Sequence, residues 1–122
     1  MSTEFLVQLF HILFVGGLFI YVGITRNDLP KFMYPTLLVL GIIIFLYHIY
    51  KSFVKPQRAW INYIHIFLIA PLLVYIGYNG YNGTDTPRKF FELLLMAGFA
   101  AIGYHGFYLV RSIYPKKITE DK

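Results

Sequence analysis

Long apolar stretches alternate with short polar breaks along the whole chain. Each stretch has about the 20 residues that a helix needs to cross a hydrocarbon core roughly 30 Å thick, at about 1.5 Å per residue. Helices satisfy all of their backbone hydrogen bonds internally, as a lipid environment requires. The pattern therefore predicts an all-α fold, an integral membrane four-helix bundle forming one domain over residues 1–122. The predicted spans are Phe5–Ile24, Phe32–Phe53, Ala59–Tyr78 and Phe90–Ile113.

The polar breaks carry residues that end helices or form turns. Pro30 stands where the second helix should begin, Pro87 precedes the fourth, and the segment 79–89 is rich in Asn and Gly. No break is long enough for a separate soluble domain, so we expect any function to lie within the membrane or at its faces. The first stretch follows no basic region and has no small-residue cleavage site, which predicts a retained span rather than a cleaved signal.

The composition supports the membrane prediction. Hydrophobic residues make up 57% of the chain and charged residues only 14%, whereas soluble domains keep roughly a quarter of their residues charged. The absence of cysteine excludes a disulfide framework and a thiolate metal site. The net charge of +5 lies outside the apolar stretches, so we expect the lipid bilayer as the partner and no nucleic acid. A homo-oligomer or another membrane partner remains open.

The basic residues predict how the chain is oriented. Four spans place both termini on one face, and that face carries more Lys and Arg than the other. Both termini are therefore expected in the cytoplasm of a multi-pass membrane protein. The face of the termini has seven basic residues, Lys51, Lys55, Arg58, Arg111, Lys116, Lys117 and Lys122, against four on the other, Arg26, Lys31, Arg88 and Lys89.

The two halves of the chain align with one another. The segment His11–Gly23 matches His65–Gly77 at an offset of 54, which pairs the first helix with the third. The second helix pairs with the fourth at an offset of 57, because Pro30, Gly41 and His48 fall on Pro87, Gly98 and His105. The alignment predicts two tandem helical-hairpin repeats, residues 5–53 and 59–113, in the same orientation. Such repeats are related by a pseudo-two-fold axis along the membrane normal.

One histidine falls in each predicted helix, and all four fall into register in the alignment. Counted from the cytoplasmic helix ends, His11, His48, His65 and His105 lie roughly 7 to 12 Å inside that face at about 1.5 Å per residue. A single histidine near a membrane face is usually an interfacial or packing residue. Four at one depth predict a shared layer around the axis of the bundle, as in bundles that build metal sites from facing helices.

Neutral imidazole is a ligand for transition metal ions, and two histidines on opposite helices form the axial pair of a haem b. Gly41 and Gly98 lie two turns from His48 and His105 on the same helix faces, where they would admit a flat macrocycle; ordinary packing of membrane helices is the alternative. Acidic residues lie only at the ends of the spans, which argues against a carboxylate-bridged di-iron site. The basic residues available to haem propionates are Lys51, Lys55, Arg58 and Arg111, although the positive-inside rule also accounts for them.

With one histidine in each of four helices, the chain resembles transmembrane b-type cytochromes, which ligate haem with histidines of a four-helix bundle. The resemblance implies haem b and electron transfer. The usual two-haem plan places histidines near both faces, whereas here a single layer leaves at most one haem and two histidines without a role. The composition, rich in Phe, Tyr, Ile and Asn, also resembles that of small membrane proteins of large DNA viruses.

Three functions remain open at this point. The first is a redox or metal-binding protein with His48 and His105, or His11 and His65, as symmetry-related ligands. The second is a proton-conducting or pH-gated bundle, because imidazoles titrate near neutrality. The third is a structural or assembly protein, for example of a viral membrane, that binds no cofactor. The sequence contains no Ser-His-Asp constellation and does not predict an enzyme.

Overall fold

The computed structural model describes residues 2–114, with Arg58 represented by its backbone alone. These residues confirm the all-helical prediction and contain no strand. Four helices in this part of the chain are long and apolar enough to cross a membrane. Three of the basic residues in the orientation count, Lys116, Lys117 and Lys122, lie outside the described residues.

Two of the four long helices are assembled from several consecutive segments. The first contains α1 (Thr3–Phe10), η1 (His11–Gly16), α2 (Gly17–Thr25) and the 3₁₀ turn η2 (Arg26–Asp28). The second is α3 (Met33–Val54), which the 3₁₀ turn η3 (Pro56–Arg58) connects to the third. The third contains α4 (Ala59–Ile64), η4 (His65–Ile69) and α5 (Ala70–Tyr81), and the fourth is α6 (Arg88–Ile113). These limits differ from the predicted spans only at the ends.

The first and third long helices each contain a π-helical segment that begins at a histidine. Segment η1 begins at His11 and η4 begins at His65, two positions that match at the offset of 54. Pro71 lies just after η4 and has no N–H to donate to the preceding turn, so a local widening of the helix accommodates it. Glycines at 16 and 17 give η1 the corresponding freedom. Such π-bulges occur often at functional sites because they redirect the side chains they carry.

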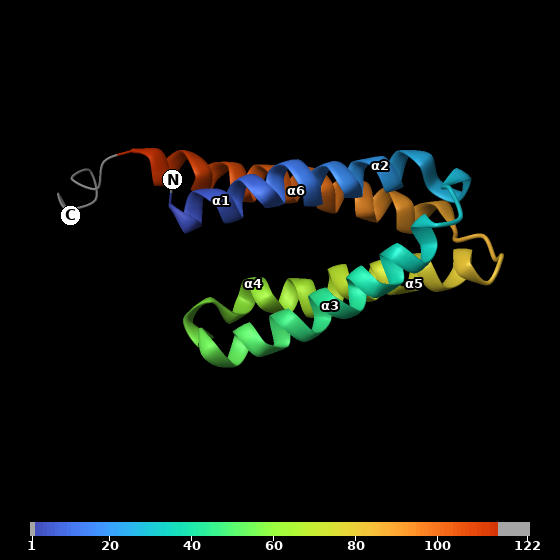
Figure 1. Cartoon of the computed structure of the whole chain (residues 1–122), viewed down its shortest axis with the longest axis horizontal. Helices are drawn as coiled ribbons and strands as arrows, with labels where there is room; N and C mark the ends of the chain where they lie inside the picture. The colour runs from blue at the N-terminus through green and yellow to red at the C-terminus, as the bar shows by residue number, and fades with distance from the viewer. Residues whose placement is uncertain (1, 115–122) are drawn as a thin grey trace.

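The helices form two layers, and each layer pairs helices that are not the two halves of one predicted hairpin (Figure 1). In the first layer, α6 packs along α1, η1 and α2. In the second layer, α3 packs along α4, η4 and α5. The first long helix therefore lies beside the fourth, and the second beside the third. An exchange of the two sequence halves maps one layer onto the other.

Matched close contacts hold each pair of helices together. A Cβ added to Gly23 would lie 3.0 Å from the carbonyl oxygen of Phe91, and one added to Gly77 would lie 2.6 Å from that of Tyr34. Phe91 and Tyr34 match at the offset of 57, and Gly77 and Gly23 at 54. Backbones approach this closely only where a side chain is absent. The same crossing point therefore recurs in both layers.

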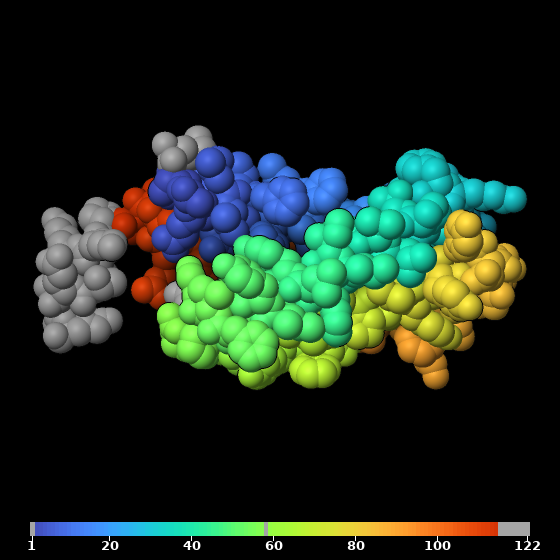
Figure 2. Space-filling model, turned by 60° about the horizontal axis from the view of Figure 1, so that its bottom comes forward, coloured from blue at the N-terminus to red at the C-terminus, as the bar shows by residue number. Residues whose placement is uncertain are grey.

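The buried apolar core lies at the end of the molecule where the loops before α3 and α6 are found, here called the loop end. Its largest fully buried side chains include Phe19, Phe91 and Leu37. At the opposite end, called the terminal end, α1 begins and α6 ends, and the two layers diverge toward it (Figure 1). Figure 2 shows α3 running along one face of the molecule, between the first long helix and α5. The layers are therefore anchored to one another chiefly at the loop end.

Polar side chains fasten the two loops together at that end. Oδ1 of Asn27 accepts a hydrogen bond from the backbone N–H of Thr86 at 3.0 Å, and Nδ2 of Asn27 donates to the carbonyl of Thr86 at 3.0 Å. Nδ2 of Asn79 donates to Oγ1 of Thr86 at 3.1 Å. Thr86 is buried, so these bonds satisfy polar groups that water does not reach. The connection holds the two sequence halves together independently of the apolar core.

Candidate functional site

The four predicted histidines form two stacked pairs, one in each layer. The ring centroids of His11 and His105 are 4.3 Å apart, with an angle of 24° between the planes. Those of His48 and His65 are 4.0 Å apart, with an angle of only 3°. Each pair joins the two antiparallel helices of its layer at the same depth, near the terminal end. The predicted matching of depth therefore holds within each pair.

The two pairs also interact with each other across the interface between the layers. His11 interacts electrostatically with His48 and His65, which belong to the other layer, as well as with its stacked neighbour His105. His65 likewise interacts with His105. His48 and His105 are the more enclosed of the four, with 8% and 9% of their surface exposed. The two pairs are therefore close enough for a charge on a ring of one layer to affect a ring of the other.

Hydrogen bonds fix the tautomer of every ring. Each Nδ1 lies within hydrogen-bonding distance of an oxygen that accepts but does not donate, so Nδ1 must carry the proton. Nε2 then has a free lone pair, which is the arrangement found in histidines that bind metals. The acceptors are the carbonyl oxygens of Val7, Ile44 and Ile61 and the Oε1 atom of Gln8, at 2.8, 2.9, 2.8 and 2.6 Å from Nδ1 of His11, His48, His65 and His105 respectively.

A tyrosine precedes each of the two enclosed histidines and meets it edge to face. Tyr47 and His48 have ring centroids 5.2 Å apart at 89°, and Tyr104 and His105 have centroids 5.0 Å apart at 90°. Tyr104 also meets Trp60 of the other layer at 5.9 Å. Aromatic contacts of this kind restrict the orientation of a ring. His48 and His105 are therefore held on one face by a stacked imidazole and at a side by a tyrosine.

The structure places Gly41 and Gly98 at helix contacts inside each layer. A Cβ on Gly41 would lie 3.1 Å from the carbonyl oxygen of Ala70, and one on Gly98 would lie 3.3 Å from that of Gly16. Ala70 and Gly16 match at the offset of 54. The space beside both glycines is thus filled by the neighbouring helix, which gives them a packing role. Whether they border a haem stays a prediction.

Lys51 and Arg111, two of the basic residues predicted to be available to haem propionates, lie on the terminal side of the histidines. Lys51 interacts electrostatically with His48, His65 and His105, and its Nζ lies 5.6 Å from the centre of the Tyr47 ring. Arg111 is exposed and lies over the ring of Phe107 at 5.7 Å. Lys51 is therefore near the histidine layer, whereas Arg111 is turned toward the outer surface of α6. The side chain of Arg58 lies outside the described residues.

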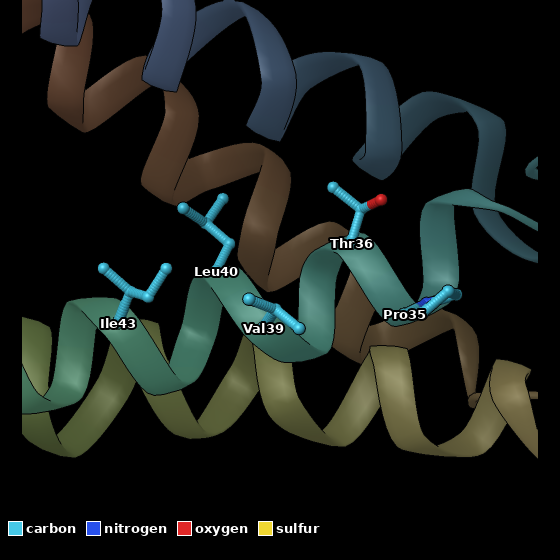
Figure 3. A pocket seen from close by; sticks show the side chains of 5 residues that line it. All are labelled: Pro35, Thr36, Val39, Leu40 and Ile43. Atoms are coloured by element: carbon cyan, nitrogen blue, oxygen red, sulfur yellow. The ribbon is translucent and has the colours of Figure 1, made fainter.

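Among residues 2–114, no three His, Asp or Glu side chains gather closely enough to hold one metal ion. The four imidazoles are instead found as two stacked pairs. A shallow apolar hollow of about 470 Å³ lies on α3 toward the loop end, lined by Pro35, Thr36, Val39, Leu40 and Ile43. Figure 3 shows Thr36, Leu40 and Ile43 pointing from α3 toward the other layer. Ile43 is five residues from His48, so the hollow begins about 7.5 Å from the histidine at about 1.5 Å per residue.

Two polar residues of the site were not predicted from the sequence. Gln8 holds His105, and Asn62 is almost completely buried, with 1% of its surface exposed. Neither the oxygen nor the nitrogen of the Asn62 amide has a hydrogen-bond partner among the residues that the structure describes. A signal for both was present, because they match at the offset of 54 and each lies three residues before a histidine.

Comparison with known proteins identifies no matching family model, no matching curated protein and no matching solved structure.

Proposed function

We propose that this chain is a multi-pass membrane protein of two tandem repeats that binds one haem b between its two layers for electron transfer. His48 and His105 would hold the haem iron in this proposal. The observation that supports it is the set of four imidazoles in two stacked pairs, each with Nδ1 occupied and Nε2 free. Tautomers fixed in this way are prepared to ligate a metal centre. A haem held there would supply a one-electron iron couple.

The membrane location rests on the outward surface of the helices. Large apolar side chains are exposed along all four, among them Leu13 at 67%, Phe53 at 81% and Phe67 at 76% of their surface. A soluble protein rarely exposes a continuous apolar surface of this kind. The lipid bilayer is the partner that covers it. Both termini are placed in the cytoplasm by the count of basic residues, and the matched glycine contacts of the two layers support the tandem repeat.

Haem suits the site better than a single metal ion. A zinc or copper site built by a protein takes three or four side-chain ligands, and the described residues offer no such group. Haem brings four nitrogens of its own, so it needs only two from the protein. The stacked rings of one layer are too close to enclose a macrocycle, whereas His48 and His105 belong to opposite layers. The layers diverge toward the terminal end (Figure 1), so in this proposal the haem enters between them from that end.

The two remaining histidines gain a role in this arrangement. His11 stacks on His105, and His65 stacks on His48, so each ligand is supported by an aromatic face from the adjacent helix. Lys51 lies on the terminal side of the layer, where it would pair with a propionate. A proton relay is less well supported, because a relay requires groups spaced along the membrane normal and the four histidines share one level.

The test is to produce the protein in a haem-proficient host, purify it in detergent and record oxidised and dithionite-reduced visible spectra with metal analysis. The expected result is one haem per chain with the sharp α and β bands of a low-spin, bis-imidazole iron in the reduced form. A colourless protein that also fails to take up added ferric haem would overturn the proposal. Such a result would favour a structural role for the histidine pairs.

A further inference from the structure

Asn62 is the one side chain of the histidine layer whose polar groups are buried without partners. With 1% of its surface exposed, the residue has access to almost no water, and neither Oδ1 nor Nδ2 forms a hydrogen bond to the described part of the chain. Buried amides are nearly always satisfied, so an unpaired one points to a partner that arrives with a change of state. Asn62 lies in α4, three residues before His65, and therefore on the same helix face.

The stacking of the rings shows what this face contacts. His65 stacks on His48 at 4.0 Å, so α4 turns this face toward α3. The corresponding residue in the other layer is Gln8, one turn before His11 in the first long helix. Its Oε1 accepts a hydrogen bond from Nδ1 of His105 at 2.6 Å. By the exchange of the two halves, His105 corresponds to His48, and the counterpart of Gln8 is Asn62.

The two layers differ at this contact. His105 is held by a side chain of the opposite helix, whereas Nδ1 of His48 donates to the carbonyl of Ile44 in its own helix at 2.9 Å. Asn is one methylene shorter than Gln, and its amide forms no hydrogen bond to the ring while Nδ1 of His48 donates to the Ile44 carbonyl. The His105 ring is thus already held by the amide of Gln8, while Oδ1 of Asn62 is an unused acceptor on the His48 side of the site.

We propose that Asn62 is the positioning residue for His48, and that its Oδ1 accepts the Nδ1 proton of His48 when Nε2 binds the ligand. This inference rests on the proposed role of His48 as a haem ligand. On binding, the His48 ring exchanges the Ile44 carbonyl for the Asn62 amide, and the two halves of the site then match. Partners of this kind orient a ligating ring and increase its basicity, and their loss lowers metal affinity about 10- to 100-fold.

The proposal predicts opposite effects of one substitution on stability and on binding. Asn62→Leu replaces the unpaired amide by an apolar side chain of similar shape, which should raise the melting temperature of the haem-free protein. The same substitution should weaken ferric haem binding about 10- to 100-fold. Gln8→Leu is the matched control: because it breaks an existing hydrogen bond, it should lower the melting temperature and also weaken haem binding.

The experiment titrates ferric haem into detergent-purified, haem-free parent, N62L, Q8L and N62Q, following the Soret band, and measures melting temperatures without haem. N62Q should bind at least as tightly as the parent, because the longer amide reaches the ring. If the parent binds and N62L binds equally well, this inference is overturned and the proposed function stands. A destabilised or unfolded haem-free N62L overturns it too, since the amide would then have a structural partner. A parent that binds no haem overturns the proposed function and this inference with it.

Discussion

The double substitution His48→Ala and His105→Ala is expected to abolish haem binding, and either substitution alone to weaken it by more than about 100-fold. Each removes a nitrogen that would bind the haem iron, a larger loss than the 10- to 100-fold effect of removing a partner behind a ligand. The two rings come from different layers, so each substitution removes the proposed ligand of one layer and leaves the ligand of the other in place. Soret titration of the haem-free proteins measures both effects.

The matched control is the double substitution His11→Phe and His65→Phe. Phenylalanine preserves an aromatic face against His105 and His48 but has no nitrogen for iron. This variant is expected to bind haem within about tenfold of the parent, as a support behind the ligands would imply. The opposite pattern, with binding retained in the first double variant and lost in the second, would assign His11 and His65 as the ligands.

Gly77→Ala is expected to lower the free energy of unfolding by about 1–3 kcal/mol, the usual range for overpacking a close contact. The added Cβ would lie 2.6 Å from the carbonyl oxygen of Tyr34 and 2.7 Å from the amide nitrogen of Leu38. Both are backbone atoms, so the clash is relieved only if α3 and α5 move apart. Unfolding in mixed micelles with increasing sodium dodecyl sulfate measures the change.

Gly103→Ala serves as the control for Gly77→Ala. A Cβ at this position of α6 would meet nothing within 4 Å. The substitution should therefore be neutral or raise the stability by about 0.5–1 kcal/mol, because alanine loses less entropy than glycine in a helix. If Gly77→Ala proves as stable as Gly103→Ala, the close approach of α3 and α5 does not exist in solution.

The apolar stretches were sufficient to predict four long helices, because stretch length and charge depletion are properties of the chain itself. The pairing of helices was not predictable in this way. Contacts such as those of Gly23 with Phe91 and of Gly77 with Tyr34 determine which helices lie together. The sequence alone does not show whether a glycine faces lipid or the backbone of a neighbouring helix. The alignment of the halves nevertheless contained the matching positions.

The histidines illustrate the same limit. Their common depth follows from counting residues along helices, and the stacked pairs agree with it. The direction of the His11 and His65 rings depends on hydrogen bonds to carbonyls one turn away and on the π-helical segments. Neither feature can be recognised from the sequence alone. Gln8 and Asn62 could have been found from the alignment, because polar residues within apolar spans are rare and these two are in register.

We propose that the four imidazoles share one level, with their Nε2 atoms free for a ligand. Nitrogen-15 NMR of histidine-labelled protein in detergent, at a pH where the rings are neutral, tests it most directly. We predict protonated Nδ1 and unprotonated Nε2 in all four rings. A diamagnetic zinc porphyrin does not accept two axial ligands readily, so low-spin cobalt(III) protoporphyrin is the suitable probe. It should shift Nε2 of His48 and His105 and leave Nε2 of His11 and His65 nearly unchanged. Rings protonated at Nε2, or four rings that do not respond to the porphyrin, would contradict the account.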